Sequence, residues 1–401
     1  MPDPADFDAR LSEALGRYAE RAPAAPSLAD VADAAMGAGG TTARRWTFPS
    51  PRSASLILLL GLLLLAMLAV AFGAGGRLFQ RDQLAEAAPS PTASPALTPA
   101  PSGPVIGDGE AWIAYMGTSS DRLVWAVRPD GTGRHMLFPL VPGGEQQHPD
   151  WAPDGGRLVF SVIGTVTQTI WIGDADGSNT SMLVDCRLPC QRVDEPAWSP
   201  DGGSIAYQRM VSDAGAAVST LEILDLLTRQ TRIVLTAPAG HAVYAPRWSG
   251  DGTRIVYESV TMASPAVDAE VTSSALTVID VMSPAPTPRE ITKPEVRCSN
   301  PDWSWVNDRI VCTKPVAASG FDGPADLYTL QPDGTAFAPL TAVAASGSIA
   351  IKPTWLPDGS GVIFCDSGGH MSTILADGTG LASAVAEGAD SGLHPRLRPT
   401  P

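Results

Sequence analysis

Carboxylates placed at a fixed distance from tryptophans are the side chains of this 401-residue chain that could most readily do chemistry. Asp154, Asp201, Asp251 and Asp358 each follow a Trp by three positions. A ring of such groups could bind a metal ion or act in catalysis. An Asp beside Gly in a short turn, however, usually accepts hydrogen bonds from its own backbone. We therefore interpret these four as turn residues and predict no metal site.

Other patterns typical of enzymes are missing or poorly placed. The segment CDSGG at residues 365–369 resembles the surroundings of the serine in trypsin-like proteases, but it lies at a strand end inside a repeat and is interpreted as a loop. The sequence contains no G-x-S-x-G, H-E-x-x-H or Walker loop. The five histidines are dispersed, at His135, His148, His241, His370 and His394. These observations predict a protein that is not an enzyme and has no cofactor.

The tryptophans themselves belong to a phrase that occurs five times. The copies are WAPDGGRLVF from Trp151, WSPDGGSIAY from Trp198, WSGDGTRIVY from Trp248, WSWVNDRIVC from Trp303 and WLPDGSGVIF from Trp355. A Pro stands two residues before each Trp, and successive tryptophans are 47, 50, 55 and 52 residues apart. Pro and Gly around Asp predict a tight reversal, and the apolar run after it predicts a short strand. We expect each Trp to pack between neighbouring repeats.

Two further strand-like runs lie between consecutive phrases, for example residues 221–225 and 232–235. Four strands in a period near fifty residues are typical of a β-propeller blade. The P-x-W-S-P-D-G phrases and the later D-G turns resemble those of the TolB-type, WD-repeat-like β-propeller family over residues 105–401. The resemblance implies an all-β fold with a binding role.

The two ends of this region predict the number of blades. Residues 112–115 match the strand after the turn, but no Trp phrase precedes them, whereas Pro395 stands where a sixth Pro-x-Trp is due. We therefore predict six blades. The C-terminal strand becomes the innermost strand of a blade whose other three strands come from residues 112–139, which closes the ring.

All five cysteines follow residue 104, which agrees with an oxidising compartment. Cys186 and Cys190 bracket three residues and are candidates for a small disulfide loop, with a zinc site as the rival interpretation. Cys298 precedes an inner strand and Cys312 ends the strand paired with it, so we predict a second disulfide between them. Cys365 is then left over.

One face of the propeller is the candidate recognition surface. The loops before each Pro-x-Trp and those after each second strand should open on the same side, around the channel mouth. The candidate residues there are Glu145, His148, Asp194, Glu195, His241, Tyr244, Glu295 and Arg297.

The net charge of −15 makes nucleic acid an improbable partner, because an acidic surface repels phosphate. Residues Leu56–Ala74 form a run of nineteen without a charge, long enough to cross a bilayer as a helix. We predict a transmembrane helix over residues 54–76, with a cleaved signal peptide as the alternative. Arginines before the run favour a cytoplasmic N-terminus. The Pro-rich residues 77–104 then read as a tether to an extracytoplasmic propeller.

Residues 1–53 contain two short patterns typical of helices, around Leu11 and around Val31. They predict either a docking element for a cytoplasmic partner or transient helices in a mostly disordered tail. A short helical region, one span and a large outer domain together resemble a membrane anti-sigma factor. That resemblance implies a cytoplasmic partner for residues 1–53, although the tail lacks the His and Cys cluster of the zinc-type members.

Three functions are compatible with the sequence. The leading interpretation is a membrane-anchored, non-catalytic propeller that binds a protein, peptide or glycan at one face. The second is a transmembrane sensor or anti-sigma-like regulator with the propeller as sensing domain. The third is a hydrolase with an active site at the channel mouth.

Overall fold

The protein is described from a computed structural model, which covers residue 106 and residues 109–400 except 119–121, 165–167, 214, 265, 267–268, 317–322, 367 and 386–391. The tail 1–53, the predicted membrane helix 54–76 and the linker 77–104 lie outside the described residues. Within the described residues, none of the helices has the length and apolar character required to cross a membrane.

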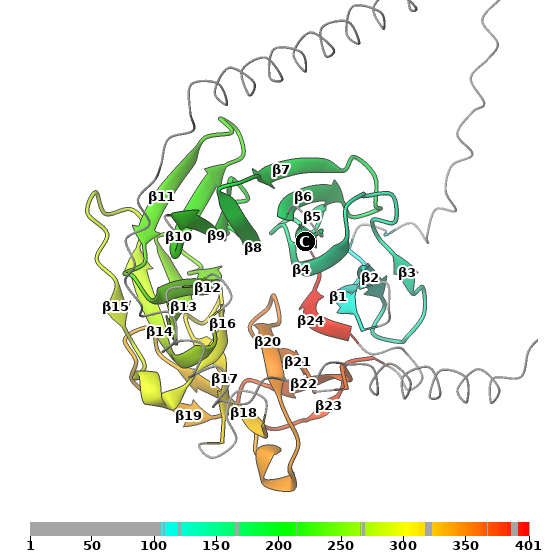
Figure 1. The fold of residues 1–401 in the computed structure, drawn as a ribbon. Coiled ribbons are helices and arrows are strands. Elements are labelled where there is room, and N and C mark those ends of the chain that lie inside the picture. Colours follow the sequence, from blue (N-terminus) through cyan, green and yellow to red (C-terminus); the bar gives the residue numbers. More distant parts are fainter. Residues whose placement is uncertain are drawn as a thin grey trace, which may run out of the picture. The chain divides into compact units, whose positions relative to one another are not determined.

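The described residues form six four-stranded antiparallel sheets arranged as blades around a central axis (Figure 1). The sheet orders are β24-β1-β2-β3, β4-β5-β6-β7, β8-β9-β10-β11, β12-β13-β14-β15, β16-β17-β18-β19 and β20-β21-β22-β23. The first strand of each order is the innermost. The six-bladed all-β prediction is confirmed.

The strands of the first three blades in chain order are β1 (Ile113–Gly117), β2 (Val124–Val127), β3 (His135–Met136), β4 (Glu145–Trp151), β5 (Arg157–Ile163), β6 (Gln168–Asp174), β7 (Ser181–Cys186), β8 (Cys190–Trp198), β9 (Ser204–Asp213), β10 (Ala216–Asp225) and β11 (Thr231–Thr236). The remaining strands are β12 (His241–Trp248), β13 (Arg254–Met262), β14 (Val271–Asp280), β15 (Arg289–Glu290), β16 (Ser299–Trp303), β17 (Ile310–Pro315), β18 (Ala325–Leu330), β19 (Ala338–Pro339), β20 (Ile351–Trp355), β21 (Gly361–Cys365), β22 (Met371–Leu375), β23 (Ala382–Ser383) and β24 (Gly392–Leu397). Two 3₁₀ turns, η1 (Pro294–Val296) and η2 (Ala344–Ser346), precede β16 and β20.

The ring closes through the C-terminal strand. β24 pairs antiparallel with β1, with Ile113 opposite Leu397 and Ala114 opposite Arg396. The first blade is thus completed by residues from the far end of the chain, as the sequence predicts. Closure of this kind leaves no exposed edge between the first and last repeats.

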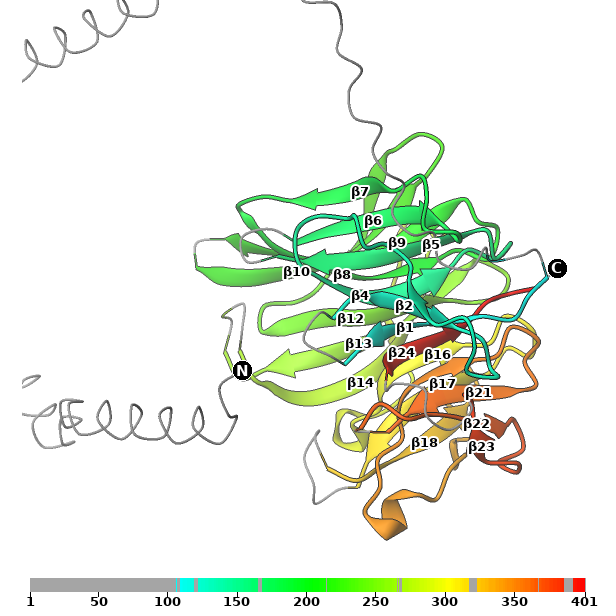
Figure 2. The same cartoon turned by 90° about the vertical axis from the view of Figure 1, so that its right-hand side faces the viewer.

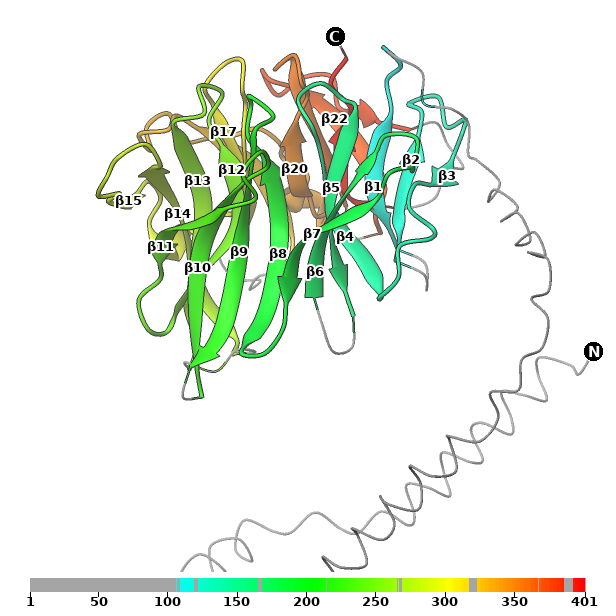
Figure 3. The ribbon, with the colours of Figure 1, turned by 90° about the horizontal axis from the view of Figure 1, so that it is seen from above.

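The six inner strands define two faces of the ring. We call the end at which they finish, next to the Trp-turn phrases, the turn face, and the end at which they begin the loop face. Figures 2 and 3 show the C-terminal end of the chain on the turn face and the long β9–β10 hairpin reaching out on the loop face.

Each phrase tryptophan packs against the preceding blade. Trp198, for example, belongs to a core cluster that contains Val159 and Ile170 of the blade before it, and is 1 % exposed. The turn aspartates bond their own turns: Asp154 Oδ1 accepts from the Gly156 amide at 2.8 Å and Asp201 Oδ1 from the Gly203 amide at 2.9 Å. The phrase therefore supplies both the packing between blades and a defined turn.

All six inner strands carry a β-bulge at the residue before their Pro. This residue has a left-handed backbone in every blade, at His148, Glu195, Ala245, Asn300, Lys352 and His394, with φ between 46° and 55°. In the second blade the register moves from Gln147 opposite Ser161 to Asp150 opposite Val159, so one inner-strand residue is extra. A bulge bends the strand and re-aims its side chains. Here it turns one side chain per blade toward the axis.

The cysteines form two disulfide bonds, one in the connection between β7 and β8 and one across the β16–β17 hairpin. Cys186 is joined to Cys190 and Cys298 to Cys312, with Cα atoms 5.1 Å and 5.8 Å apart. Cys365 is a buried free thiol, and burial raises its pKa to about 12. Its thiol is therefore protonated at neutral pH and unreactive.

Candidate functional site

A funnel-shaped cavity opens on the turn face at the centre of the ring. It has a volume of about 370 Å³, which lies within the range of small-ligand pockets. Its wall contains all five phrase tryptophans, and its rim is made by residues of the turns that follow, including Pro153, Trp305, Pro357 and Pro399. The repeated phrase therefore lines a cavity as well as building the blades.

Four charged side chains, each no more than 14 % exposed, form the floor of the funnel. They occupy the position between Pro and Trp in their strands: Asp150, Arg247, Asp302 and Arg396. Arg396 bridges the two carboxylates, with Nη1 2.9 Å from Asp302 Oδ1 and Nε 3.4 Å from Asp150 Oδ1. Arg247 Nε lies 3.4 Å from the same Asp302 oxygen. The floor carries no net charge but is densely polar.

The floor carboxylates also connect neighbouring blades. Asp150 Oδ2 accepts a hydrogen bond from the Trp198 amide at 2.8 Å, and Asp302 Oδ2 accepts one from the Trp355 amide at 2.7 Å. Each bond satisfies a backbone donor on the free edge of the next inner strand. The carboxylates therefore have a structural role that does not require a ligand.

The pKa values of the two floor arginines are shifted in opposite directions. Burial, followed by the nearby Arg396 charge, lowers the pKa of Arg247 to about 10. Burial acts on Arg396 in the same direction, but Asp302 and Asp150 outweigh it and raise its pKa. Arg396 is thus the well-paired cation, and Arg247 is the poorly compensated one.

Below the floor the channel narrows to a waist, which we define by the six left-handed residues. The cavity there measures about 20 Å³, room for about one water molecule. It shares Arg247, Thr354 and Arg396 with the funnel. The inner end of the funnel is therefore closed to anything larger than a water molecule.

A histidine pair occupies the waist. His148 Nδ1 lies 2.7 Å from Asp194 Oδ1, and its ring meets His394 edge-on at 4.2 Å between centroids. Burial and the neighbouring His148 lower the pKa of His394 well below its usual value. Burial would raise the pKa of Asp194, but His148 outweighs it and brings the value to about 2. The His148–Asp194 pair resembles the His–Asp part of a catalytic site. The His148 ring, however, packs against the ring of His394 and does not face a substrate.

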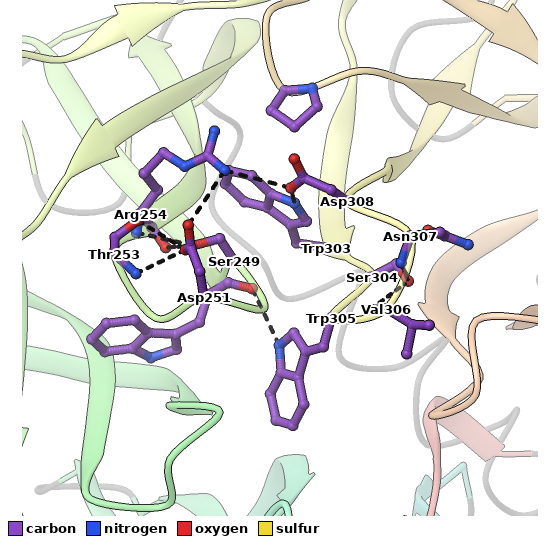
Figure 4. Close-up of polar contacts among 12 residues, drawn as sticks. Ser249, Asp251, Thr253, Arg254, Trp303, Ser304, Trp305, Val306, Asn307 and Asp308 are labelled. Atoms are coloured by element: carbon purple, nitrogen blue, oxygen red, sulfur yellow. Dashed lines mark hydrogen bonds and ion pairs between the residues drawn. The ribbon is translucent and has the colours of Figure 1, made fainter.

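The turn after β16 departs from the repeat and gives the rim its exposed aromatic residue. Trp305 stands where three copies have Pro and one has Gly. It is 37 % exposed and donates from Nε1 to the Trp248 carbonyl at 3.2 Å (Figure 4). Its backbone passes so close to Gly250 that a Cβ there would lie 2.2 Å from the Trp305 oxygen. The Gly in WSGDG therefore accommodates this turn.

The contacts around this turn are shared between two blades. Asp251 accepts from Ser249 Oγ at 2.6 Å, and this hydroxyl together with the Thr253 bonds outweighs burial and lowers the pKa of Asp251 to about 2. Asp308 accepts from Trp303 Nε1 at 2.8 Å and also pairs with Arg254 at 3.5 Å (Figure 4). These contacts fix the position of Trp305 at the rim.

The candidate residues from the sequence are divided between the waist and the loop face. His148, Asp194 and Glu195 come together in or beside the waist. Glu145 pairs with Arg122 at 3.3 Å, and Tyr244 Oη accepts from Arg192 at 3.1 Å. Glu295 and Arg297 line a groove of about 450 Å³ with Lys314, whereas His241 stands apart at the start of β12. These eight residues therefore do not come together in a single site.

The sequence-based analysis missed the funnel floor. A signal was present, because the residue between Pro and Trp reads Asp, Ala, Arg, Asp, Thr and, before Leu397, Arg along the six repeats. Charged side chains between two buried positions of an inner strand have to face the axis. Opposite charges at four of these six places therefore predict a buried network.

The comparisons with known proteins bear on the fold. No protein-family model matches the chain. No curated protein matches its sequence. Among solved structures, TolB from Acinetobacter baumannii is similar with a TM-score of 0.54 and 17 % identity, over 73 % of this chain and 67 % of that one. The fold is a six-bladed β-propeller of the TolB type.

Two other solved structures share the architecture. Hydrazine synthase from Kuenenia stuttgartiensis matches with a TM-score of 0.54 and 13 % identity, over 74 % of this chain and 48 % of that one. A chain of a nidogen/laminin complex matches with a TM-score of 0.51 and 8 % identity, over 73 % and 100 % of the two chains. One name denotes an enzyme and the other a protein complex, so the fold does not decide between catalysis and binding.

Proposed function

We propose that this protein is a non-catalytic binding module that receives part of a protein or peptide partner in the turn-face funnel. The observation that carries the proposal is the funnel itself: about 370 Å³, apolar at its rim, polar at its floor and closed below. Recognition sites commonly combine an apolar wall with a few convergent polar groups. A blind cavity of this size suits a loop or chain end better than a folded surface.

The orientation of the tryptophans favours a protein or peptide over a glycan. The five phrase tryptophans are each no more than 5 % exposed, because their ring faces pack between blades. Sugars bind aromatic residues through exposed ring faces, and among the described residues that line the funnel Trp305 is the one aromatic residue with such a surface. Trp is also among the residue types enriched at the energetic centres of protein interfaces, with Tyr and Arg.

The proposal includes a location. The uncharged segment Leu56–Ala74 would hold the propeller outside the cytoplasm, and two disulfides suit an oxidising compartment. Protease added to intact spheroplasts tests this part. We expect loss of residues 105–401 and protection of residues 1–53, whereas full protection of the propeller would contradict it.

Site-specific photo-cross-linking tests the binding site. A benzophenone amino acid would replace Val306, which is 65 % exposed beside Trp305, or in a matched variant Glu295, which is exposed on the loop face. In cells of the native host we expect a discrete adduct from position 306 and none from position 295. An adduct from position 295 alone would move the site to the loop face.

A further inference from the structure

Arg247 has the least-used bonding capacity in the funnel. A guanidinium carries five N–H donors. Among the described residues, Arg247 donates one hydrogen bond, from Nη1 to the neighbouring Pro246 carbonyl at 2.7 Å. Its buried Nε has no hydrogen-bond partner, although Asp302 lies 3.4 Å away. Buried donors are normally satisfied, so this arrangement is unusual for a completed structural pair.

The floor carboxylates are already engaged by other groups. Asp302 Oδ1 accepts from Arg396 at 2.9 Å, and Asp302 Oδ2 accepts from the Trp355 amide. Asp150 divides its oxygens between Arg396 and the Trp198 amide. Arg247 therefore shares one oxygen with a cation that holds it more closely.

The other unpartnered polar atoms of the funnel lining are also donors. Trp198 Nε1 and Trp355 Nε1 are buried without a hydrogen-bond partner, and both residues line the funnel. Every unpartnered buried polar atom among the described lining residues thus needs an acceptor. A carboxylate is an acceptor-only group that matches the planar fork of Arg.

The depth of Arg247 restricts what can reach it. Arg247 lines both the funnel and the waist, and the waist holds about one water molecule. A group at the floor must therefore be the inner end of whatever enters from the turn face. For a polypeptide this is a C-terminus or a side chain at the tip of a loop.

We propose that Arg247 binds a carboxylate at the inner end of the partner, and that this contact makes the funnel specific for a polypeptide presenting an acidic group. The inference rests on the proposed function. Two sources share the chemistry: a C-terminal carboxylate, and an Asp or Glu side chain. Arg247→Gln should leave the fold intact, because Asp302 keeps Arg396 and the repulsion between the two arginines disappears.

Three short peptides test the proposal on the full-length protein. They are acetyl-Leu-Pro-Leu with a free C-terminus, the same peptide as its C-terminal amide, and acetyl-Leu-Asp-Leu amide, with binding followed by tryptophan fluorescence. We expect a carboxylate peptide to bind at least about tenfold more tightly than the neutral amide. Preference for the first peptide assigns the group to a chain terminus, and preference for the third assigns it to a side chain.

Variants complete the experiment. Arg247→Gln should reduce carboxylate binding to the level of the amide, and Arg247→Lys should fall between the two because it keeps the charge without the fork. Arg229→Gln removes an equal charge from an exposed turn and should change nothing. Equal binding of acid and amide, or an Arg247→Gln variant that binds the acid normally, would overturn the proposal.

Absence of binding by either carboxylate peptide up to about 10 mM would also overturn it. None of these results affects the photo-cross-linking experiment, which uses the native partner and tests the funnel independently of the carboxylate.

Discussion

The two ends of the central channel are built from the same six inner strands, yet they differ in kind. At the turn face, short repeated turns surround a funnel with five buried tryptophans and a paired charged floor. At the loop face, long hairpins such as β9–β10 and irregular loops surround separate polar features, among them the groove at Glu295 and Arg297. The difference shows that a repeat can specify structure and still create a cavity. The geometry common to the six blades brings one position of each inner strand, the residue after its Pro, to the axis, and this residue differs from blade to blade.

The charges of the two halves of the channel differ as well. The floor places two arginines against two aspartates. The waist and the adjoining loop-side half contain Asp194, Glu195 and Glu258, with His148, Lys352 and the neutral His394 beside them. The turn half thus carries equal numbers of positive and negative side chains, whereas the loop half contains Glu258, whose pKa burial raises to about 7.

The largest expected effect concerns the floor. Asp302→Ala removes the carboxylate that holds Arg396, Arg247 and the Trp355 amide, so two buried cations are left with Asp150 alone. We expect the free energy of unfolding to fall by about 3–5 kcal/mol, measured by urea denaturation. Glu295→Ala on the loop face should change it by less than about 0.5 kcal/mol. An equal loss of stability in Asp302→Ala and Glu295→Ala would contradict the structural difference between the turn-face and loop-face ends of the channel.

The next effect is on binding. Trp305→Ala should weaken binding of the native partner by about 2–4 kcal/mol, because an aromatic residue at the rim is lost while the fold is kept. Leu188→Ala removes a loop-face apolar side chain that is 83 % exposed and serves as the control. Titration of the purified partner measures both. A larger loss for Leu188→Ala would place the contact on the loop face.

The third prediction separates the two halves by pH. Burial raises the pKa of Glu258 to about 7, against an ordinary value of 4.5, so the folded protein holds this proton longer than the unfolded chain does. Its contribution to stability is therefore full below about pH 4.5 and is lost as the pH rises to 7.

Glu258→Gln removes this dependence, since the amide oxygen can still accept from the Asn300 amide. Relative to the native protein, the variant should gain roughly 2–3 kcal/mol between pH 5 and pH 8. Urea denaturation across this range measures it. A constant difference between the two proteins would show that Glu258 ionises normally.

The smallest effect concerns the bulge. Ala245 is a buried non-glycine residue with φ of 46°, a conformation that costs an L-residue about 1 kcal/mol. Ala245→Gly should therefore be neutral or stabilising by up to about 1 kcal/mol. Ala275→Gly in the interior of β14 should destabilise by about 0.5–1 kcal/mol. Thermal unfolding of the pair checks the sign, and a clear destabilisation by Ala245→Gly would argue against strain at the bulge.

Much of the fold could be predicted because the phrase repeats in phase. Trp198 and its four counterparts, each with a Pro two residues earlier, indicate the inner strands, and Pro395 near the C-terminus indicates the closing strand. Antiparallel pairing alone places Cys298 near Cys312. These features depend on local patterns and on the topology that they imply.

The site could not be predicted in the same way. The residue before a Pro is normally extended, so nothing in His148-Pro149 or Lys352-Pro353 indicates a left-handed bulge that points a side chain to the axis. The pairing of Asp302 with Arg396 joins residues 94 positions apart and depends on how six blades meet at the centre. The sequence-based choice of the loop face remains a prediction, and the geometry favours the turn face.

Hydrogen–deuterium exchange of the full-length protein with and without its cross-linked partner tests the central claim most directly. We predict slower exchange at the rim, in residues 151–157, 303–309 and 355–359, with little change at residues 145–148 and 294–297. Protection confined to residues 145–148 and 294–297 would contradict the account and would make the loop face the binding surface.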